Sequence, residues 1–232
     1  MIYVTSDIHG RLDRLKKLVR KLDFKIDDKL IILGDLVDRG NEPIEVIEFV
    51  MNHPNIEVIM GNHDEMMLHS LKLNDEVQIE RWNRNDNQTT YNGFKLRSFN
   101  EQVKILNYID SLPYFKIIDN KFLLVHAGFD PIRLNMDMKT MTLEDSLMKQ
   151  KDRLVWEREL FFMNKGLIGL ITIFGHSPVT YINRCLGNPD KKPYEIWIDD
   201  KYNDKIGVDT ANCYDGRLAC IRLNDMKAFY IE

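Results

Sequence analysis

Groups able to bind metals and to transfer protons stand directly after five short apolar runs of this chain. The central stretch is 34–40 (GDLVDRG), which carries two carboxylates and an arginine. Residues 7–10 (DIHG) and 61–64 (GNHD) follow apolar residues in the same way. Two later runs end in 126–128 (HAG) and 175–178 (GHSP). Polar groups at the exit of a buried strand favour a ligand site, because open α/β sheets bind ligands at the carboxyl ends of their strands.

These exits offer oxygen and imidazole donors without thiolate, a combination that suits Mn²⁺, Fe or Zn²⁺. We place Asp35 between two ions, since two-metal hydrolases hold their ions ~3.5–4 Å apart. Such a pair lowers the pKa of a bound water towards ~7, so hydroxide is available near neutral pH. The exits supply Asp7, His9, Asp35, Asn62, His63, His126 and His176. We therefore expect two divalent metal ions, Mn²⁺ before Fe or Zn²⁺, and a metal-bridging hydroxide that attacks a phosphoryl group.

An attacking hydroxide needs an acid for the leaving group on the opposite side. His63 is the candidate, because it follows Asn62 directly and cannot easily share the same coordination sphere. Asp38 is the natural carboxylate partner that would orient its imidazole and raise its pKa. Arg39 then offers a planar fork for phosphate oxygens.

Each of these motifs alone also has a structural explanation. An Asp-x-His pair after a strand is often structural, and residues 61–64 could form a turn with a helix cap. Asp38 and Arg39 could form a surface ion pair. A structural explanation is hard to extend to all of them, since each stands at a strand-to-turn exit, so the joint functional interpretation is favoured.

Apolar periodicity predicts the elements that position these groups. The run 29–33 is short, mostly apolar and followed by glycine, which is typical of a buried strand. The runs 2–6 and 56–60 have a similar pattern. Helical spacing over 11–22, and Pro43 at the start of a second helix, predict two strand–helix–strand units and an at least partly parallel sheet.

Later parts of the chain are less regular. Residues 81–92 are rich in Asn, Gln and Thr, so we expect a loop there, within an active-face insertion around 74–97 of a single domain over 1–232. Residues 129–142 are expected to be irregular. The remaining expectations are a helix at 98–109 with a capping box, a hairpin at 114–118 and 121–126, helices within 143–166, a strand at 170–174, and antiparallel strands at 195–198, 205–208, 217–223 and 227–231.

Composition narrows the classes of function. A net charge of −4 argues against a nucleic-acid binder that relies on a broad basic face. The longest apolar run, around 166–174, is too short to span a bilayer. The three cysteines form no CxxC pair and the N-terminus starts with a strand rather than a signal peptide, so we expect reduced thiols and a cytoplasmic protein without a membrane partner.

Residues 7–10, 34–40 and 61–64 together resemble the three signature blocks of the metallophosphoesterase (calcineurin-like) superfamily. The Asp-Arg-Gly in the second block is similar to the phosphoprotein phosphatase branch, and residues 126–128 and 175–178 match two later histidine blocks. The whole most resembles compact bacterial and bacteriophage serine/threonine protein phosphatases. The resemblance implies an α/β fold, a β-sandwich of two mixed sheets flanked by helices in four layers.

The resemblance also implies a role for each matching residue. His63 would be the general acid supported by Asp38, and Arg39 would bind phosphate. Trp156-Glu157-Arg158 is similar to the context of a further phosphate-binding arginine, which Arg153 could replace. One metal ion would be held by Asp7, His9 and Asp35, and the other by Asp35, Asn62, His126 and His176.

The chain departs from the family pattern at several positions. Met60 stands where many phosphatases of this branch have arginine, and Asp64 replaces the more common glutamate. Residues 82–91 resemble a Trp-x-x-Asn-Gly-Gly-x-x-Thr segment without its glycines, and 208–211 resemble an Ile-Asp-Thr-Gly block with alanine for glycine.

The resulting hypothesis is a dinuclear-metal phosphatase acting on phosphoserine or phosphothreonine in proteins, or on small phosphoesters. The alternative from the same superfamily is a dinucleoside polyphosphate (diadenosine tetraphosphate) hydrolase. A phosphate-binding module without catalysis is disfavoured, because every expected ligand and the acid are present. A nuclease is disfavoured by the acidic balance. The sequence does not predict the oligomeric state.

Overall fold

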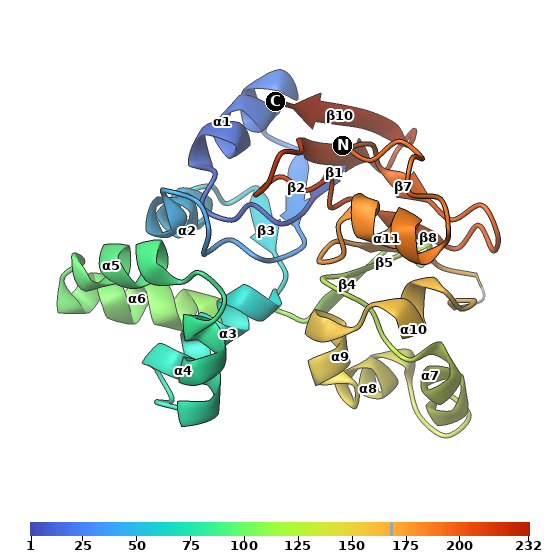
Figure 1. Cartoon of the computed structure of the whole chain (residues 1–232), viewed down its shortest axis with the longest axis horizontal. Coiled ribbons are helices and arrows are strands. Elements are labelled where there is room, and N and C mark those ends of the chain that lie inside the picture. Colours follow the sequence, from blue (N-terminus) through green and yellow to red (C-terminus); the bar gives the residue numbers. More distant parts are fainter. Residues whose placement is uncertain (168) are drawn as a thin grey trace.

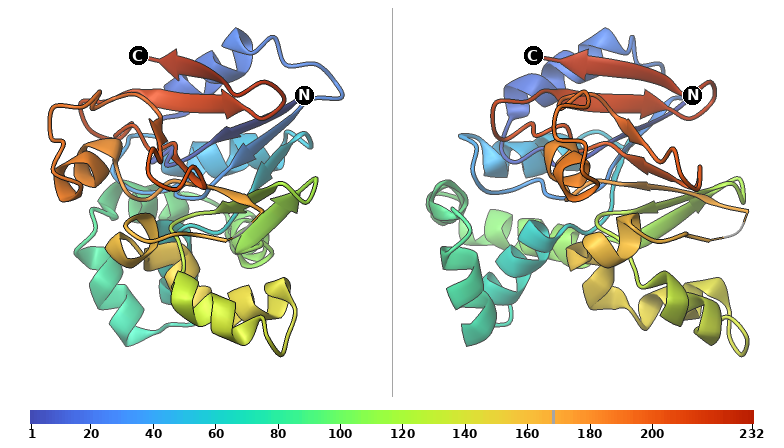
Figure 2. Two further views of the ribbon diagram at one scale, coloured as in Figure 1. Left: turned by 90° about the vertical axis from the view of Figure 1, so that its right-hand side faces the viewer. Right: turned by 45° about the vertical axis from the view of Figure 1, so that its right-hand side comes forward.

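The computed structural model describes residues 1–167 and 169–232. Across these residues, two five-stranded mixed sheets lie face to face and helices cover their outer sides (Figures 1 and 2). The predicted four-layer α/β sandwich is therefore confirmed. Ordinary β-sandwich packing explains the inner layer, because side chains of both sheets bury each other there.

The first sheet has the strand order β10-β9-β1-β2-β3. β1 pairs in parallel with β2, and β2 with β3, as the two strand–helix–strand units predict. β9 runs antiparallel to both β1 and β10. The bounds are β1 Ile2–Thr5, α1 Leu12–Lys21, β2 Lys29–Ile32, α2 Pro43–Met51, β3 Ile56–Val58, β9 Leu218–Arg222 and β10 Lys227–Ile231.

The second sheet has the order β4-β5-β6-β8-β7. The predicted hairpin forms from β4 and β5, which pair antiparallel. The expectation that 205–208 is antiparallel is wrong in part: β8 runs parallel to β6 and antiparallel only to β7. The bounds are β4 Phe115–Ile118, β5 Phe122–Val125, β6 Ile171–Phe174, β7 Trp197–Ile198 and β8 Lys205–Gly207.

Strand alternation distributes the apolar side chains over three layers of core. Val4 and Ile31 point between the sheets, where they meet Leu124, Ile173 and Ile206 of the second sheet. Their neighbours along the strands face outward and pack against α1 and α2 on one side or the helices after β5 on the other. The central strands are therefore buried on both faces, by the facing sheet on one side and by helices on the other.

The stretch 81–92 is not the loop that we expected. Two short helices, α4 and α5, occupy most of it and stand beside α3 and α6 (Figure 1). The Asp75 side chain caps α4 by accepting the N–H groups of Val77 and Gln78, so local capping offsets the low apolar content. The bounds are α3 Asn62–Leu71, α4 Glu76–Asn83, α5 Gln88–Lys95 and α6 Phe99–Asp110, the last with the predicted Ser98–Glu101 capping box.

Residues 129–142 are likewise not irregular throughout. Asp130 caps a helix there by accepting the N–H groups of Ile132 and Arg133, and Pro131 occupies its first turn. The bounds of the remaining helices are α7 Pro131–Asp137, α8 Leu143–Met148, α9 Lys151–Trp156, α10 Glu159–Phe162 and α11 Val179–Cys185. Within the described residues, no helix has the length and apolar character that crossing a membrane requires.

Candidate active site

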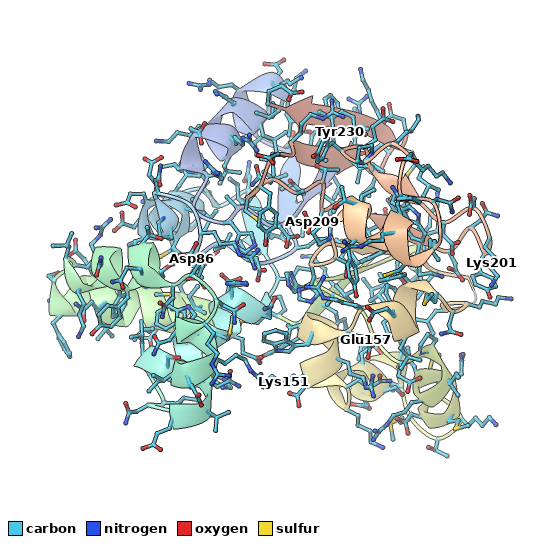
Figure 3. All side chains as sticks on the ribbon, in the orientation of Figure 1. Asp86, Lys151, Glu157, Lys201, Asp209 and Tyr230 are labelled. Atoms are coloured by element: carbon cyan, nitrogen blue, oxygen red, sulfur yellow. The ribbon has the colours of Figure 1, made fainter. Side chains whose placement is uncertain are left out.

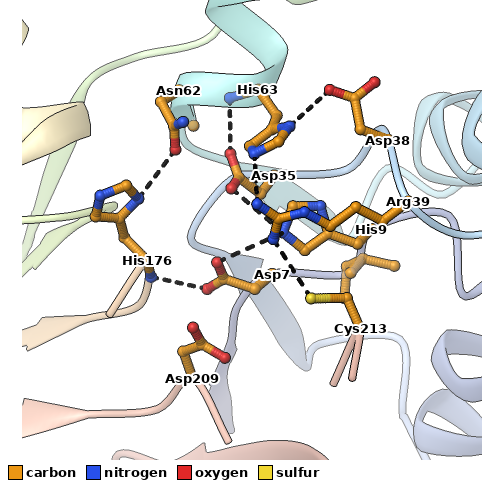
Figure 4. A network of polar contacts seen from close by, with 12 residues as sticks. Asp7, His9, Asp35, Asp38, Arg39, Asn62, His63, His176, Asp209 and Cys213 are labelled. Carbon is orange, nitrogen blue, oxygen red and sulfur yellow. Dashed lines mark hydrogen bonds and ion pairs between the residues drawn. The ribbon is translucent and has the colours of Figure 1, made fainter. Parts of the chain in front are cut away.

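The polar motifs meet where the carboxyl ends of strands from both sheets converge. Figure 4 shows Asp7 and His9 from the end of β1, Asp35 from the end of β2, Asn62 and His63 from the start of α3, and His176 from the end of β6. In Figure 3 the neighbouring Asp209 lies near the middle of the molecule. The structure thus brings together side chains that the sequence places at separate strand exits.

The backbone at these exits is forced into the left-handed region. Non-glycine residues rarely adopt positive φ, and they do so mainly where the surrounding structure holds them for a functional reason. The clustering of six such residues at one place therefore marks a built site. They are Asp7, His9, Asp35, Asp38, Arg39 and His176, with φ between 46° and 69°.

Asp35 stands between two groups of potential ligands. Its Oδ2 lies 3.5 Å from His9 Nε2, and its Oδ1 lies 3.5 Å from His126 Nε2. Asp7 Oδ1 lies 4.0 Å from the same His9 nitrogen. One carboxylate thus presents one oxygen to each side, as expected of a residue shared by two metal ions.

Three donor atoms converge on the second side. His126 Nε2 lies 2.9 Å from Asn62 Oδ1 and 3.2 Å from His176 Nδ1. His176 Nδ1 lies 3.0 Å from the same amide oxygen. The lone pairs of these oxygen and nitrogen atoms would repel each other at such distances unless a cation or a proton lies between them.

The histidine tautomers fit metal binding. His9 Nδ1 lies 2.8 Å from the Val37 carbonyl and His126 Nδ1 lies 2.6 Å from the Leu33 carbonyl, so each Nδ1 donates its proton to the backbone. That leaves both Nε2 atoms as free electron pairs aimed at Asp35. The residues present therefore fit a pair of divalent cations, which would be held by the sets predicted from the sequence.

Burial keeps the imidazoles in their metal-binding form. It is the main cause that lowers the pKa of His9 and His176 well below the usual value and lowers that of His126 as well. The pKa of Asp35 is raised well above its usual value, first by burial and then by Asp7 and Asp64. Neutral imidazoles beside crowded carboxylates make a site that attracts divalent cations.

Asp64 fixes the position of Asp35. Its Oδ2 accepts the Asp35 N–H at 2.8 Å, and its Oδ1 accepts the Leu36 N–H at 3.0 Å. The Asp35 carboxylate itself accepts the backbone N–H of His63 at 3.0 Å. The 34–40 loop and α3 therefore hold each other, and the aspartate at position 64 serves although the family pattern favours glutamate.

His63 is positioned like a proton donor to the pocket. Its Nδ1 lies 2.6 Å from Asp38 Oδ2 and donates to it, so Nε2 points towards Arg39, 3.1 Å from Nη2. His63 also forms, with His9 and Asp35, a group close enough to hold one metal ion. The engagement of Nδ1 by Asp38 supports the acid role over that of a metal ligand.

The two phosphate-binding arginines expected from the sequence lie in one small pocket. A cavity of about 90 Å³ is bordered by Arg39, Arg158, Asp35, His63 and Trp156, among others. Arg158 Nη1 also lies 3.4 Å from Ser177 Oγ. The alternative Arg153 lines a neighbouring groove instead and pairs with Glu157, so the geometry favours Arg158.

Several residues of the site were not proposed as functional from the sequence. Asp209 borders the cavity and is buried. Burial, and after it the charge of Asp7, raises the pKa of Asp209. The Asn212 amide donates to the carbonyls of Asp7 and Ile8, each at 3.0 Å, and so supports the first loop. Asp209 lies in the block 208–211 and Asn212 directly follows it, but the sequence pattern alone did not show that this block returns to the end of β1.

An α/β/β/α sandwich whose strand ends hold two adjoining His/Asp clusters defines the class of metallophosphoesterases. Comparison with protein families agrees: residues 1–209 match the calcineurin-like phosphoesterase family, and the chain belongs to it.

Two curated relatives carry the same description. The symmetrical bis(5'-nucleosyl)-tetraphosphatase of Actinobacillus succinogenes is 33% identical over 141 residues, which are 60% of this chain and 46% of that protein. The protein of the same description from Vibrio parahaemolyticus is 28% identical over 167 residues, 71% of this chain and 56% of that one. The chain thus spans about half the length of the curated relatives it matches.

Solved structures support the fold. One, provisionally described as a diadenosine tetraphosphatase, has a TM-score of 0.67 at 19% identity and covers 99% of this chain and 92% of its own. The cold-active protein-tyrosine phosphatase of a Shewanella species has a TM-score of 0.60 at 16% identity, covering 100% and 80%. At these identities the likeness concerns the fold alone.

Proposed function

We propose that this chain hydrolyses dinucleoside polyphosphates, with diadenosine tetraphosphate as the model substrate, by means of two divalent cations. This is the alternative that the sequence left open, and the curated relatives support it better than the protein phosphatase hypothesis. The observation that carries it is a small pocket, bordered by candidate metal ligands, that adjoins two larger grooves whose linings include arginine and aromatic side chains, beside four carboxylates in the first groove.

The first groove, of about 680 Å³, shares Trp156 and Arg158 with the pocket. Arg81 lies over the Trp156 ring, 5.0 Å from its centroid. An aromatic face covered by a guanidinium suits a nucleobase, which stacks on both kinds of plane.

The second groove, of about 360 Å³, shares Arg158, Pro178 and Tyr214 with the pocket. The centroid of its Tyr181 ring lies 5.4 Å from the guanidinium carbon of Arg158 and 5.6 Å from that of Arg184. A cationic centre with an aromatic side chain in each adjoining groove suits a polyphosphate that bridges two nucleosides, whereas a phosphomonoester would use only the centre.

The residues of the chain have separate tasks in this proposal. Bound divalent cations would polarise a phosphoryl oxygen and supply hydroxide near neutral pH. Arg39 and Arg158 orient the phosphate chain through its oxygens. His63 holds a proton at Nε2 for the departing oxygen, while Asp38 keeps the ring in place through Nδ1.

A substrate panel tests the proposal. The chelated protein is reloaded with Mn²⁺ and given diadenosine tetraphosphate, a phosphoserine peptide and 4-nitrophenyl phosphate, and the nucleotide products are separated. We expect the highest kcat/KM for the dinucleotide, with Asp35→Asn inactive on all three. A preference for the phosphoserine peptide would instead support the protein phosphatase hypothesis.

A further inference from the structure

The carboxylate of Asp38 is surrounded by hydrogen-bond donors of one helical segment. Trp82 Nε1 donates to both carboxylate oxygens, at 2.9 Å to Oδ2 and 3.1 Å to Oδ1. The Thr90 hydroxyl donates to Oδ1 at 2.6 Å. With His63 Nδ1 on Oδ2, a carboxylate without solvent exposure has its acceptor positions filled by three side chains.

The same segment fixes the backbone of the turn. Thr90 Oγ1 accepts the N–H of Asp38 at 2.9 Å, so this hydroxyl connects both ends of one residue. The Asp86 carbonyl accepts the N–H of Arg39 at 3.1 Å. Both turn residues have positive φ, 69° and 67°, and these contacts offset the strain of that conformation.

Trp82 and Thr90 are exceptional within their helices. Trp82 is the buried residue of α4, and Thr90 and Phe94 are those of α5. Most other side chains from Glu76 to Lys95 face solvent. The segment buries the rings of Trp82 and Phe94 in the core, and in addition it directs an indole N–H and a hydroxyl at one carboxylate.

We propose that Trp82 and Thr90 are positioning residues that hold Asp38 against His63 and thereby aim the imidazole at the leaving group. The segment around 74–97 then acts in catalysis through Asp38, in addition to lining the first groove with Arg81. This inference rests on the proposed acid role of His63. Without either donor, Asp38 can rotate, and His63 Nε2 loses its fixed direction.

The test removes each donor. Thr90→Val replaces the hydroxyl by a methyl group with little change of shape, whereas Trp82→Phe removes the indole N–H together with part of a buried ring. Thr90→Ser keeps the hydroxyl and should restore activity. Thr89→Val is the matched control, because Thr89 is exposed on the same helix.

The readout is the dependence on the leaving group, with kcat and KM measured for phenyl phosphate and 4-nitrophenyl phosphate after Mn²⁺ loading. We expect Trp82→Phe and Thr90→Val to lower kcat for phenyl phosphate ~10–100-fold, to affect the activated ester much less, and to leave KM and bound Mn²⁺ unchanged. A merely structural role would lower both rates equally or change metal content, and either result would overturn the proposal.

Failure of the acid role itself can be recognised separately. If His63→Asn shows no selective loss with phenyl phosphate, the proposed function of His63 is wrong. If His63→Asn shows that loss and the two donor variants do not, only the positioning inference fails. As a second measurement, the downfield proton resonance of His63 Nδ1–H should shift in Trp82→Phe and Thr90→Val but not in Thr89→Val, and an unchanged resonance contradicts the inference.

Discussion

His63 is placed between two chemical roles by its own neighbourhood. Burial, followed by Arg39, keeps its pKa well below the usual value, and a neutral imidazole could bind a metal ion. The contact of Nδ1 with the Asp38 carboxylate, however, orients the ring as a proton donor towards the pocket. When Arg39 moves to a bound phosphate, Nε2 loses a positive neighbour and gains a negative one, which favours protonation.

The replacement His63→Asn distinguishes the two roles. We expect turnover of phosphoester substrates to fall ~10²–10⁴-fold, the usual contribution of a general acid, while elemental analysis still finds two Mn²⁺ per chain. Asp35→Asn serves as the comparison and should lose metal as well as turnover. One Mn²⁺ in the His63 variant would identify His63 as a ligand.

At the scale of the elements, the site depends on backbones that approach each other closely. Gly61 lies where a Cβ atom would come 2.3 Å from the Asp35 backbone nitrogen and carboxylate. Gly175 lies where a Cβ atom would come 2.3 Å from Asp7 Oδ2, next to the hydrogen bond from the His176 N–H to that oxygen. The strand exits can therefore converge only because glycine precedes the ligands.

Gly175→Ala should disturb the first loop more than its single methyl group suggests. We expect a destabilisation of about 1–3 kcal/mol, typical of an overpacked interior, and weaker Mn²⁺ binding because Asp7 must move. Thermal unfolding and a metal titration measure both. Gly166→Ala is the control, since its Cβ would meet only ordinary contacts, the closest at 3.5 Å to Asp204; equal effects of the two changes would contradict the explanation.

Most helices and strands could be predicted from local sequence patterns, because the residues that favour each element lie within it. The short apolar runs at 2–6 and 29–33 and the proline at 43 predict their strands and helix from neighbouring residues alone. The helices α4 and α5 were missed, since their stability comes from the Asp75 cap and from burial of Trp82 and Phe94 against other helices. Polar composition in 81–92 does not show these contacts.

At the scale of the whole molecule, the sandwich gathers ionisable groups that repel each other when no cation is bound. Because the pKa values of Asp35 and Asp209 are raised, the folded protein without metal keeps protons at a pH where the unfolded chain has released them. The free energy of unfolding of the metal-free protein therefore falls as the pH rises from the ordinary pKa of an aspartate to these raised values. The lowered pKa values of His9, His126 and His176 act with the opposite sign below pH about 6.5.

Cation binding needs the carboxylates and imidazoles without their protons, so stabilisation by Mn²⁺ should grow with pH. We expect the difference in Tm between loaded and chelated protein to be larger at pH about 8 than at pH about 5.5. Differential scanning calorimetry over this range measures it, with Asp35→Asn as the variant in which the difference shrinks. A difference independent of pH would mean that these groups do not bind the cation.

The sequence by itself determined which donor types stand at which strand exits, and that they suit a pair of divalent cations such as Mn²⁺, Fe or Zn²⁺. Each of those motifs is a short, contiguous stretch of sequence, so it can be recognised without knowledge of the fold. Only the tertiary structure decided that Trp82 and Thr90 meet Asp38, that Arg158 rather than Arg153 borders the pocket, and that Asp209 and Asn212 return to Asp7. These contacts join residues far apart in the chain, and packing of the two sheets and their helices, not local propensity, brings them together.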